Sequence, residues 1–240
     1  HGGFEDANGN FVLFGYRDFN SISNPALVTI TSNLSACKPF YWDCPWEFTA
    51  GCFGYDTNGN EVYVLVNNGE LMVVDAANPN VSNRILLVVG PISQDQYTDI
   101  SWDNSNNQFI ATGSAKNTPT GHEDPFVAVF KLHFNPALTV YNVTPITGYY
   151  ICDPTLVQAN EYKSLHIQTD DNTLILYHDL RLFGTPNAYD MIWLTRIKNF
   201  SNIATAIVDE SWFYQLPNTK LSAKDMIYDQ SNNRLNFLGY

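Results

Sequence analysis

The amino-acid sequence predicts an all-β protein built from repeated units of four antiparallel strands. Apolar segments of strand length recur along the whole chain, and no segment sustains the periodicity of an amphipathic helix. Polar turns rich in Asp, Asn, Gly and Ser separate these segments at similar intervals. Because 45% of the 240 residues are hydrophobic and 14% are aromatic, the chain can bury a packed core and is not expected to be disordered.

Each predicted unit opens with the same hairpin. A short apolar strand ends in Asp, a polar turn follows, and a second alternating strand comes next, as in residues 53–65. Asn-Gly and Asn-Asn tolerate the positive φ of tight turns, and an Asp side chain can accept hydrogen bonds from the turn backbone. We therefore interpret these aspartates as turn residues first. They are Asp6, Asp56, Asp103, Asp170 and Asp229, spaced 50, 47, 67 and 59 residues apart.

Two further strands follow the hairpin in most units, and we name the strands A, B, C and D in chain order. C strands are expected at 26–30, 70–74, 126–134 and 191–197, and D strands at 84–89, 138–143 and 203–208. The resulting repeats span about 1–50, 51–96, 97–162 and 163–222, with a partial fifth at 223–240.

This recurring hairpin resembles the repeat of the β-propeller superfamily. The resemblance covers nearly the whole chain and implies a single propeller domain or fragment, with at least four blades and a partial fifth. It implies an architecture and no particular activity. Since the fifth unit stops after strand B, we expect the chain to belong to a larger ring or a longer protein. The chain opens at His1 without a Met, so we also expect either a removed leader or an internal piece.

The charge balance bears on the expected partners. Asp and Glu total 24 against 12 for Lys and Arg, which gives a formal net charge of −12. Nucleic-acid binding needs a basic footprint, so nucleic acid is not an expected partner. No apolar run approaches the roughly 18 residues of a membrane-spanning helix, so no membrane span is expected either.

Cysteines and glycosylation sequons together predict a secreted or cell-surface protein. Four cysteines are compatible with two disulfides in three pairings, and a bridge between neighbouring cysteines would rigidify a short loop. Four Asn-x-Ser/Thr sequons accompany them. The cysteines are Cys37, Cys44, Cys52 and Cys152, and the sequons begin at Asn33, Asn80, Asn142 and Asn199.

Strand alternation predicts two different ends of the sheets. The A-to-B and C-to-D turns lie at one end, and the B-to-C and D-to-A connections lie at the other. Asn80 and Asn199 fall in C-to-D turns, with Asn33 near the end of a C strand, so glycans there would leave the opposite end clear. That opposite end is expected to carry long loops rich in aromatic residues, and binding usually resides in such loops. The expected binding residues are Tyr41, Trp42, Trp46, His122, Tyr149, Tyr150, Trp212 and Tyr214.

An enzymatic alternative rests on a second resemblance. The segments Asp6-Ala-Asn-Gly9, Asp43-Cys-Pro45 and Glu123-Asp-Pro125 are similar to three motifs of invertase-like glycoside hydrolases, which are propellers. The resemblance implies paired carboxylates across a glycosidic bond, with Asp43, Glu123 and Asp124 as the candidates. Two departures are that Asp43 stands where the family has Glu, and that the order of the last two motifs is reversed.

Metal and nucleophile chemistry have weaker sequence support. The five histidines lack ligand spacing, so no metal site is expected, and calcium at an Asp-containing turn is the one cofactor left open. His133, His166 and His178 fall in predicted strands and are expected to be packed or surface residues. No Gly-x-Ser-x-Gly elbow is present.

Taken together, the sequence predicts a non-enzymatic recognition or assembly module. Its ligand would be an extracellular protein, a glycan or a neighbouring subunit. A third alternative is a structural repeat of an extracellular filament or coat, which would leave exposed strand edges at its two ends for another chain.

Overall fold

The computed structural model describes residues 2–19, 22–42, 48–67, 69–88, 96–116, 123–151, 159–170, 172–182, 190–215 and 223–239. Within these residues the secondary structure consists of strands and turns without a helix. The predicted all-β class is confirmed.

The strands form five separate antiparallel sheets, each a simple meander in chain order. Sheet 1 contains β1 (Gly2–Glu5), β2 (Phe11–Phe19), β3 (Ile22–Ile30) and β4 (Cys37–Tyr41). Sheet 2 contains β5 (Ala50–Tyr55), β6 (Glu61–Asn67), β7 (Glu70–Asp75) and β8 (Ser82–Leu86). Sheet 3 contains β9 (Gln96–Asp103), β10 (Gln108–Lys116), β11 (Glu123–Asn135) and β12 (Val140–Tyr150). Sheet 4 contains β13 (Ala159–Asp170), β14 (Thr173–Leu182), β15 (Asp190–Lys198) and β16 (Ile207–Gln215), and sheet 5 is the hairpin of β17 (Ala223–Asp229) and β18 (Arg234–Gly239).

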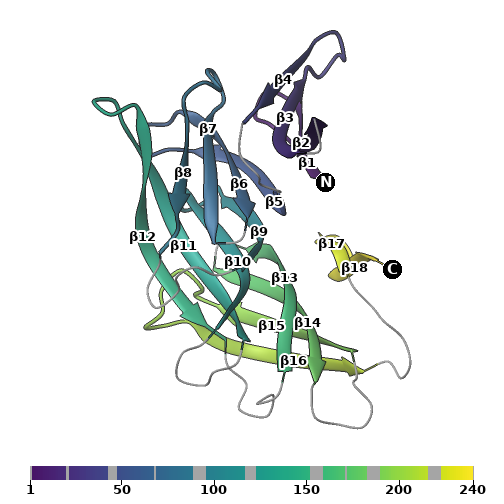
Figure 1. Cartoon of the computed structure of the whole chain (residues 1–240). Coiled ribbons are helices and arrows are strands. Elements are labelled where there is room, and N and C mark those ends of the chain that lie inside the picture. Colours follow the sequence, from purple (N-terminus) through teal and green to yellow (C-terminus); the bar gives the residue numbers. More distant parts are fainter. Residues whose placement is uncertain are drawn as a thin grey trace.

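In the described part of the chain, the sheets follow one another in a series that does not close into a ring. Figure 1 shows sheet 1 (purple) and the β17–β18 hairpin (yellow) at the two ends of the series, where they pack on sheet 2 and on sheet 4 respectively. The sheets do not follow the predicted repeat bounds at every edge, since β13 begins at Ala159, inside the repeat expected at 97–162.

The repeated aspartates have the turn function that the sequence predicts. The Asp56 carboxylate accepts the backbone N–H groups of Asn58 and Asn60, both at 2.8 Å, and the Asn60 side-chain amide at 3.0 Å. Gly59 in the same turn has φ of 81°, where an L-residue would be strained. Asp6 makes the equivalent bonds with Asn8 and Asn10.

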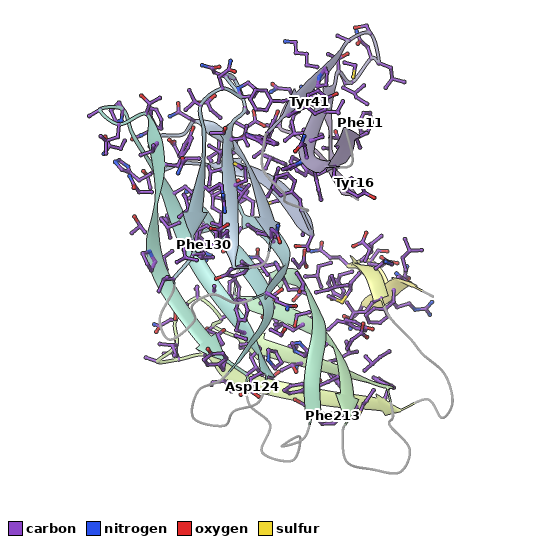
Figure 2. All side chains as sticks on the ribbon, in the orientation of Figure 1. Phe11, Tyr16, Tyr41, Asp124, Phe130 and Phe213 are labelled. Atoms are coloured by element: carbon purple, nitrogen blue, oxygen red, sulfur yellow. The ribbon has the colours of Figure 1, made fainter. Side chains whose placement is uncertain are left out.

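Successive sheets pack face to face, and this packing forms the core. In β6 of sheet 2, residues 62–66 are all at most 3% exposed, because one face of the strand packs on sheet 1 and the other on sheet 3. In β2 of sheet 1 only alternate residues are buried: Val12 is 0% exposed, whereas Phe11 is 44% and Leu13 is 46% exposed. Figure 2 shows Phe11 on this end sheet and Phe130 within the packed array.

Two predicted D strands end later than expected, which corrects their predicted bounds. The D strand expected at 138–143 is β12, Val140–Tyr150, and the D strand expected at 203–208 is β16, Ile207–Gln215. The physical reason is that aromatic runs form strands readily. Trp212 and Phe213, for instance, pair with Leu194 and Trp193 of β15.

Candidate functional site

The four sequons lie at one end of the sheets. Asn33, Asn80 and Asn199 lie in the C-to-D turns of sheets 1, 2 and 4, and Asn142 is the third residue of the D strand of sheet 3. All four asparagines are exposed. The predicted placement of Asn80 and Asn199 is confirmed, and each four-stranded sheet has one sequon at the equivalent hairpin.

Both kinds of turn share that end, as strand alternation predicts. In sheet 1 the Ser32 N–H of the C-to-D turn donates to the Asn10 side-chain oxygen of the A-to-B turn at 3.3 Å. The connections at the opposite end fall largely outside the described residues, as do Trp46 and His122 of the predicted binding set.

Most described members of the predicted binding set are packed rather than displayed on loops. Trp42 follows β4 directly, packs in the core between sheets 1 and 2, and donates its indole N–H to Ser82 Oγ at 3.1 Å. Tyr149 on β12 is 9% exposed, and its hydroxyl donates to the Phe200 carbonyl at 3.0 Å. Tyr150 and Trp212 are half-buried against the core.

Tyr41 and Tyr214 are the exposed members of that set, at 45% and 53% exposure. Both lie on D strands, β4 and β16, near the end where each strand leaves its sheet. The exposed aromatic residues of the predicted set therefore lie on outer strands rather than on loops. Among the described residues of that set, they are these two tyrosines.

The predicted carboxylates and cysteines fall mostly outside the described residues. This applies to Asp43, to the side chain of Glu123, and to Cys44 and Cys152. Asp124 is half-buried on β11. Cys37 is exposed and Cys52 is half-buried, both as free thiols, and burial raises the pKa of Cys52, with the nearby Asp99 charge adding to the effect.

A cleft of about 540 Å³ opens between sheets 1 and 2 at the turn end. Thr29, Lys38 and Phe40 of sheet 1 line one wall, and Glu61 and Tyr63 of sheet 2 line the other. The two C-to-D turns that carry Asn33 and Asn80 also contribute residues to its rim. Sequence reasoning missed this site because its residues come from separate repeats, and no motif links them.

Hydrogen bonds across the cleft join the two sheets. The Tyr63 hydroxyl donates to Asp6 Oδ2 at 3.0 Å, and Glu61 accepts the Ala7 backbone N–H at 3.0 Å. Burial raises the pKa of Glu61, and the nearby Asp6 charge raises it further. The hydrogen bond from Ala7 acts in the opposite direction and lowers it. Burial alone would raise the pKa of Asp6 as well, but hydrogen bonds from Asn10, Tyr63 and Asn8 make the net shift a lowering.

A second polar cluster joins the A strands of sheets 3 and 4. The His166 Nε2 atom lies 2.6 Å from Ser101 Oγ, and its Nδ1 atom lies 2.9 Å from Thr112 Oγ1 and 3.2 Å from Asp99 Oδ2. This is a hydroxyl, imidazole and carboxylate arrangement, but the His166 side chain is fully buried. Burial lowers the pKa of His166, with Asp99 opposing the shift. The prediction that the strand histidines are packed or surface residues is confirmed for His166 and His178, which are buried, and for His133, which is exposed.

Among the described residues, no group of three or more His, Cys, Asp or Glu side chains is arranged to hold a metal ion. The described part of the chain also contains no helix long and apolar enough to cross a membrane.

No protein-family model matches the chain, and no curated protein matches it significantly. Among the solved structures that match, two are similar over 91% of the chain. Acylaminoacyl peptidase from Pyrococcus horikoshii is 11% identical with a TM-score of 0.42, and the chain covers 38% of it. Sqt1 from Chaetomium thermophilum is 10% identical with a TM-score of 0.43, and the chain covers 60% of it. The chain thus spans less than two thirds of the length of either structure.

Proposed function

We propose that this chain is a secreted or cell-surface, N-glycosylated segment of β-propeller blades that acts as a non-enzymatic binding module. The observation that carries the proposal is the placement of the sequons, one at the same exposed hairpin of each four-stranded sheet. Chance sequons in an Asn-rich chain would also favour its turns, but chance alone has no reason to place one at the same hairpin of each four-stranded sheet. Glycans at these positions would cover one end of the array and leave the other available to a partner.

Glycan mapping after expression in a eukaryotic secretory system tests the compartment. We expect secreted protein with glycans at Asn33, Asn80, Asn142 and Asn199, seen as a loss of mass on treatment with peptide N-glycosidase. The matched variant Thr144→Ala should lose the glycan at Asn142 alone. Secreted protein with all four asparagines unmodified would contradict the proposal.

Binding itself is testable at the exposed tyrosines. We expect saturable binding of the labelled glycoprotein to cell surfaces in flow cytometry, and weaker binding after Tyr214→Ser. Ile203 is 59% exposed in the turn beside Asn199, so Ile203→Ser is the matched control and should leave binding unchanged. Equal losses from both variants would show that Tyr214 is not part of a binding surface.

A second candidate function, end-to-end assembly, is favoured by the outward faces of the two end sheets. Phe11 and Leu13 on sheet 1, and Ile227 and Leu238 on the hairpin, are 44% to 66% exposed. Exposed apolar faces of this kind often mark interaction sites. Light scattering after size exclusion should then show association that increases with concentration and is lost in Leu13→Asp. A monomer at every concentration would exclude this role for the 240-residue chain.

A further inference from the structure

The cleft between sheets 1 and 2 has the size and composition of a small-ligand site. Its volume of about 540 Å³ lies within the range of about 300 to 1,000 Å³ that is usual for such sites. It lies between two packed sheets, and Leu27 and Tyr63 in its walls belong to the core that joins them, at 1% and 3% exposure. A ligand would therefore meet a largely preformed surface.

The charge of the cleft selects against anionic ligands. Its lining includes the carboxylates of Asp6, Glu61 and Asp75, with Lys38 as the basic residue among the described lining residues. A phosphate or carboxylate ligand would face net negative charge at short range. Asp6 already accepts four hydrogen bonds, whereas Glu61 accepts two, from Ala7 and Asn8, so the Glu61 oxygens can accept more. The cleft thus suits a neutral molecule with many donors, such as a polyol.

The remaining wall supplies an apolar platform. Phe40 is half-buried, and its ring is fixed edge-on against Trp42, with the ring centroids 5.0 Å apart. Pro39 and Pro79 also line the cleft. The face of an aromatic ring carries partial negative charge and attracts polarised C–H groups. Hydroxyl-binding carboxylates opposite an aromatic ring match the two kinds of surface on a pyranose, its polar rim and its C–H face.

We propose that this cleft is a binding site for a neutral saccharide, with Glu61 accepting hydroxyl groups and Phe40 packing on the sugar face. This proposal rests on the binding function proposed above and specifies its ligand class. The cleft lies at the sequon end of the sheets, away from the exposed Tyr41 and Tyr214. Because the turns of Asn33 and Asn80 form its rim, the saccharide has two sources: a glycan attached to this chain, or a free oligosaccharide.

The test uses unglycosylated protein, titrated with N-acetylglucosamine, its β-1,4-linked dimer and mannose, by saturation-transfer NMR and calorimetry. We expect binding of at least one of these probes. Glu61→Gln should weaken it about tenfold, the loss typical of a hydrogen bond to a charged group. Phe40→Ala should abolish it.

Matched controls come from the outward side of sheet 1. Glu5 and Phe11 are exposed and face away from the cleft wall, so Glu5→Gln and Phe11→Ala should leave saccharide affinity unchanged. Circular dichroism of Glu61→Gln establishes that this variant is folded if Phe40→Ala is not. Absence of binding for all three probes at millimolar concentration, or equal affinity in Glu61→Gln and Glu5→Gln, would overturn the proposal.

A second arm distinguishes the two sources. If an attached glycan occupies the cleft, glycosylated protein should not bind the added saccharide, and Asn33→Gln or Asn80→Gln should restore binding. If the ligand is free oligosaccharide, glycosylated and unglycosylated protein should bind alike. Either result supports a saccharide site. A failure to bind saccharide would be distinct from a failure of the glycan mapping, because the mapping does not depend on the cleft.

Discussion

The two interfaces that sheet 3 makes with its neighbours differ in chemistry. Against sheet 2, the A strands β5 and β9 meet through aromatic rings, with Tyr55 and Trp102 at 5.9 Å between centroids. Beneath them, Phe109 and Phe130 stack at 5.5 Å and are fully buried. Between the A strands this interface is held mainly by apolar burial, which has no preferred direction and little dependence on pH. Its directional bonds lie elsewhere, as where the Asn83 side chain and the Tyr141 backbone exchange hydrogen bonds of 3.0 and 2.7 Å.

Against sheet 4, the A strands β9 and β13 meet through a polar seam, which we define as Thr98, Asp99, Ser101, Ser164 and His166. The Thr98 hydroxyl donates to the Ser164 carbonyl at 2.6 Å, and the His166 backbone N–H donates to Asp99 at 2.8 Å. An apolar cluster lies behind the seam, with Leu176 fully buried. Hydrogen bonds are directional, so a shift of register would leave buried polar groups unpaired at a cost of about 1–3 kcal/mol each. The difference teaches that apolar burial brings these sheets together, whereas the polar seam fixes how sheet 4 is aligned.

The largest effect should come from the apolar interface. Phe130→Ala would leave a cavity between sheets 2 and 3, and we expect it to lower the free energy of unfolding by about 3–5 kcal/mol in urea titrations. Phe11→Ala, on the outward face of sheet 1, should change it by no more than about 0.5 kcal/mol. Similar losses for the two variants would contradict the packing of interior and end sheets described here.

A smaller effect should come from the A-to-B turn of sheet 3, which is hydrogen-bonded to sheet 4. Asp103 is fully buried, and its carboxylate accepts the side-chain amides of Gln108 at 2.8 Å and of Gln168, on β13, at 3.0 Å. Asp103→Ala would leave these two amide donors without an acceptor, and we expect the free energy of unfolding to fall by about 2 kcal/mol. Asp229 makes the same turn but is only half-buried, so Asp229→Ala should cost about half as much or less. Equal costs would mean that the bond to sheet 4 contributes nothing.

The sequence was sufficient to predict the hairpins, because their determinants are local. Asp, Asn and Gly at fixed offsets set the turn, and residues two to four positions apart satisfy one another's hydrogen bonds. The register between the A and B strands was harder to predict. Glu61 pairs with Tyr55, whereas Gln108 pairs with Asp103 itself, so the strands after Asp56 and Asp103 are offset by one residue. Val62 and Ile110, each facing the following sheet, are therefore equivalent, although counting from the aspartates would match Val62 with Phe109.

The candidate sites were beyond local reasoning because they depend on which sheets touch. Glu61 reaches the turn of the preceding repeat, and His166 reaches Asp99 and Ser101 across an interface, with no sequence signal at either position. The aromatic residues were misplaced for a different reason. Trp212 and Tyr149 lie beyond the ends of the predicted D strands, so they were expected in loops. Aromatic rings are stabilised most by packing on a sheet, and both residues extend these strands and pack in the core.

The polar seam should also make stability depend on pH where the apolar interface does not. Burial lowers the pKa of His166, so the folded protein holds this imidazole neutral while the unfolded chain protonates it near pH 6.5. The folded pKa lies below the unfolded one, so the stabilisation is complete above about pH 6.5 and is lost as the pH falls toward the folded pKa. We expect the free energy of unfolding to fall by up to about 1.4 kcal/mol per pH unit in this window. His166→Gln should remove that slope, whereas Phe130→Ala should cost the same at pH 7.5 and pH 5.5. If His166→Gln keeps the wild-type slope, the charge of this histidine is not what couples the seam to pH, and its role would be confined to the bonds with Ser101 and Thr112.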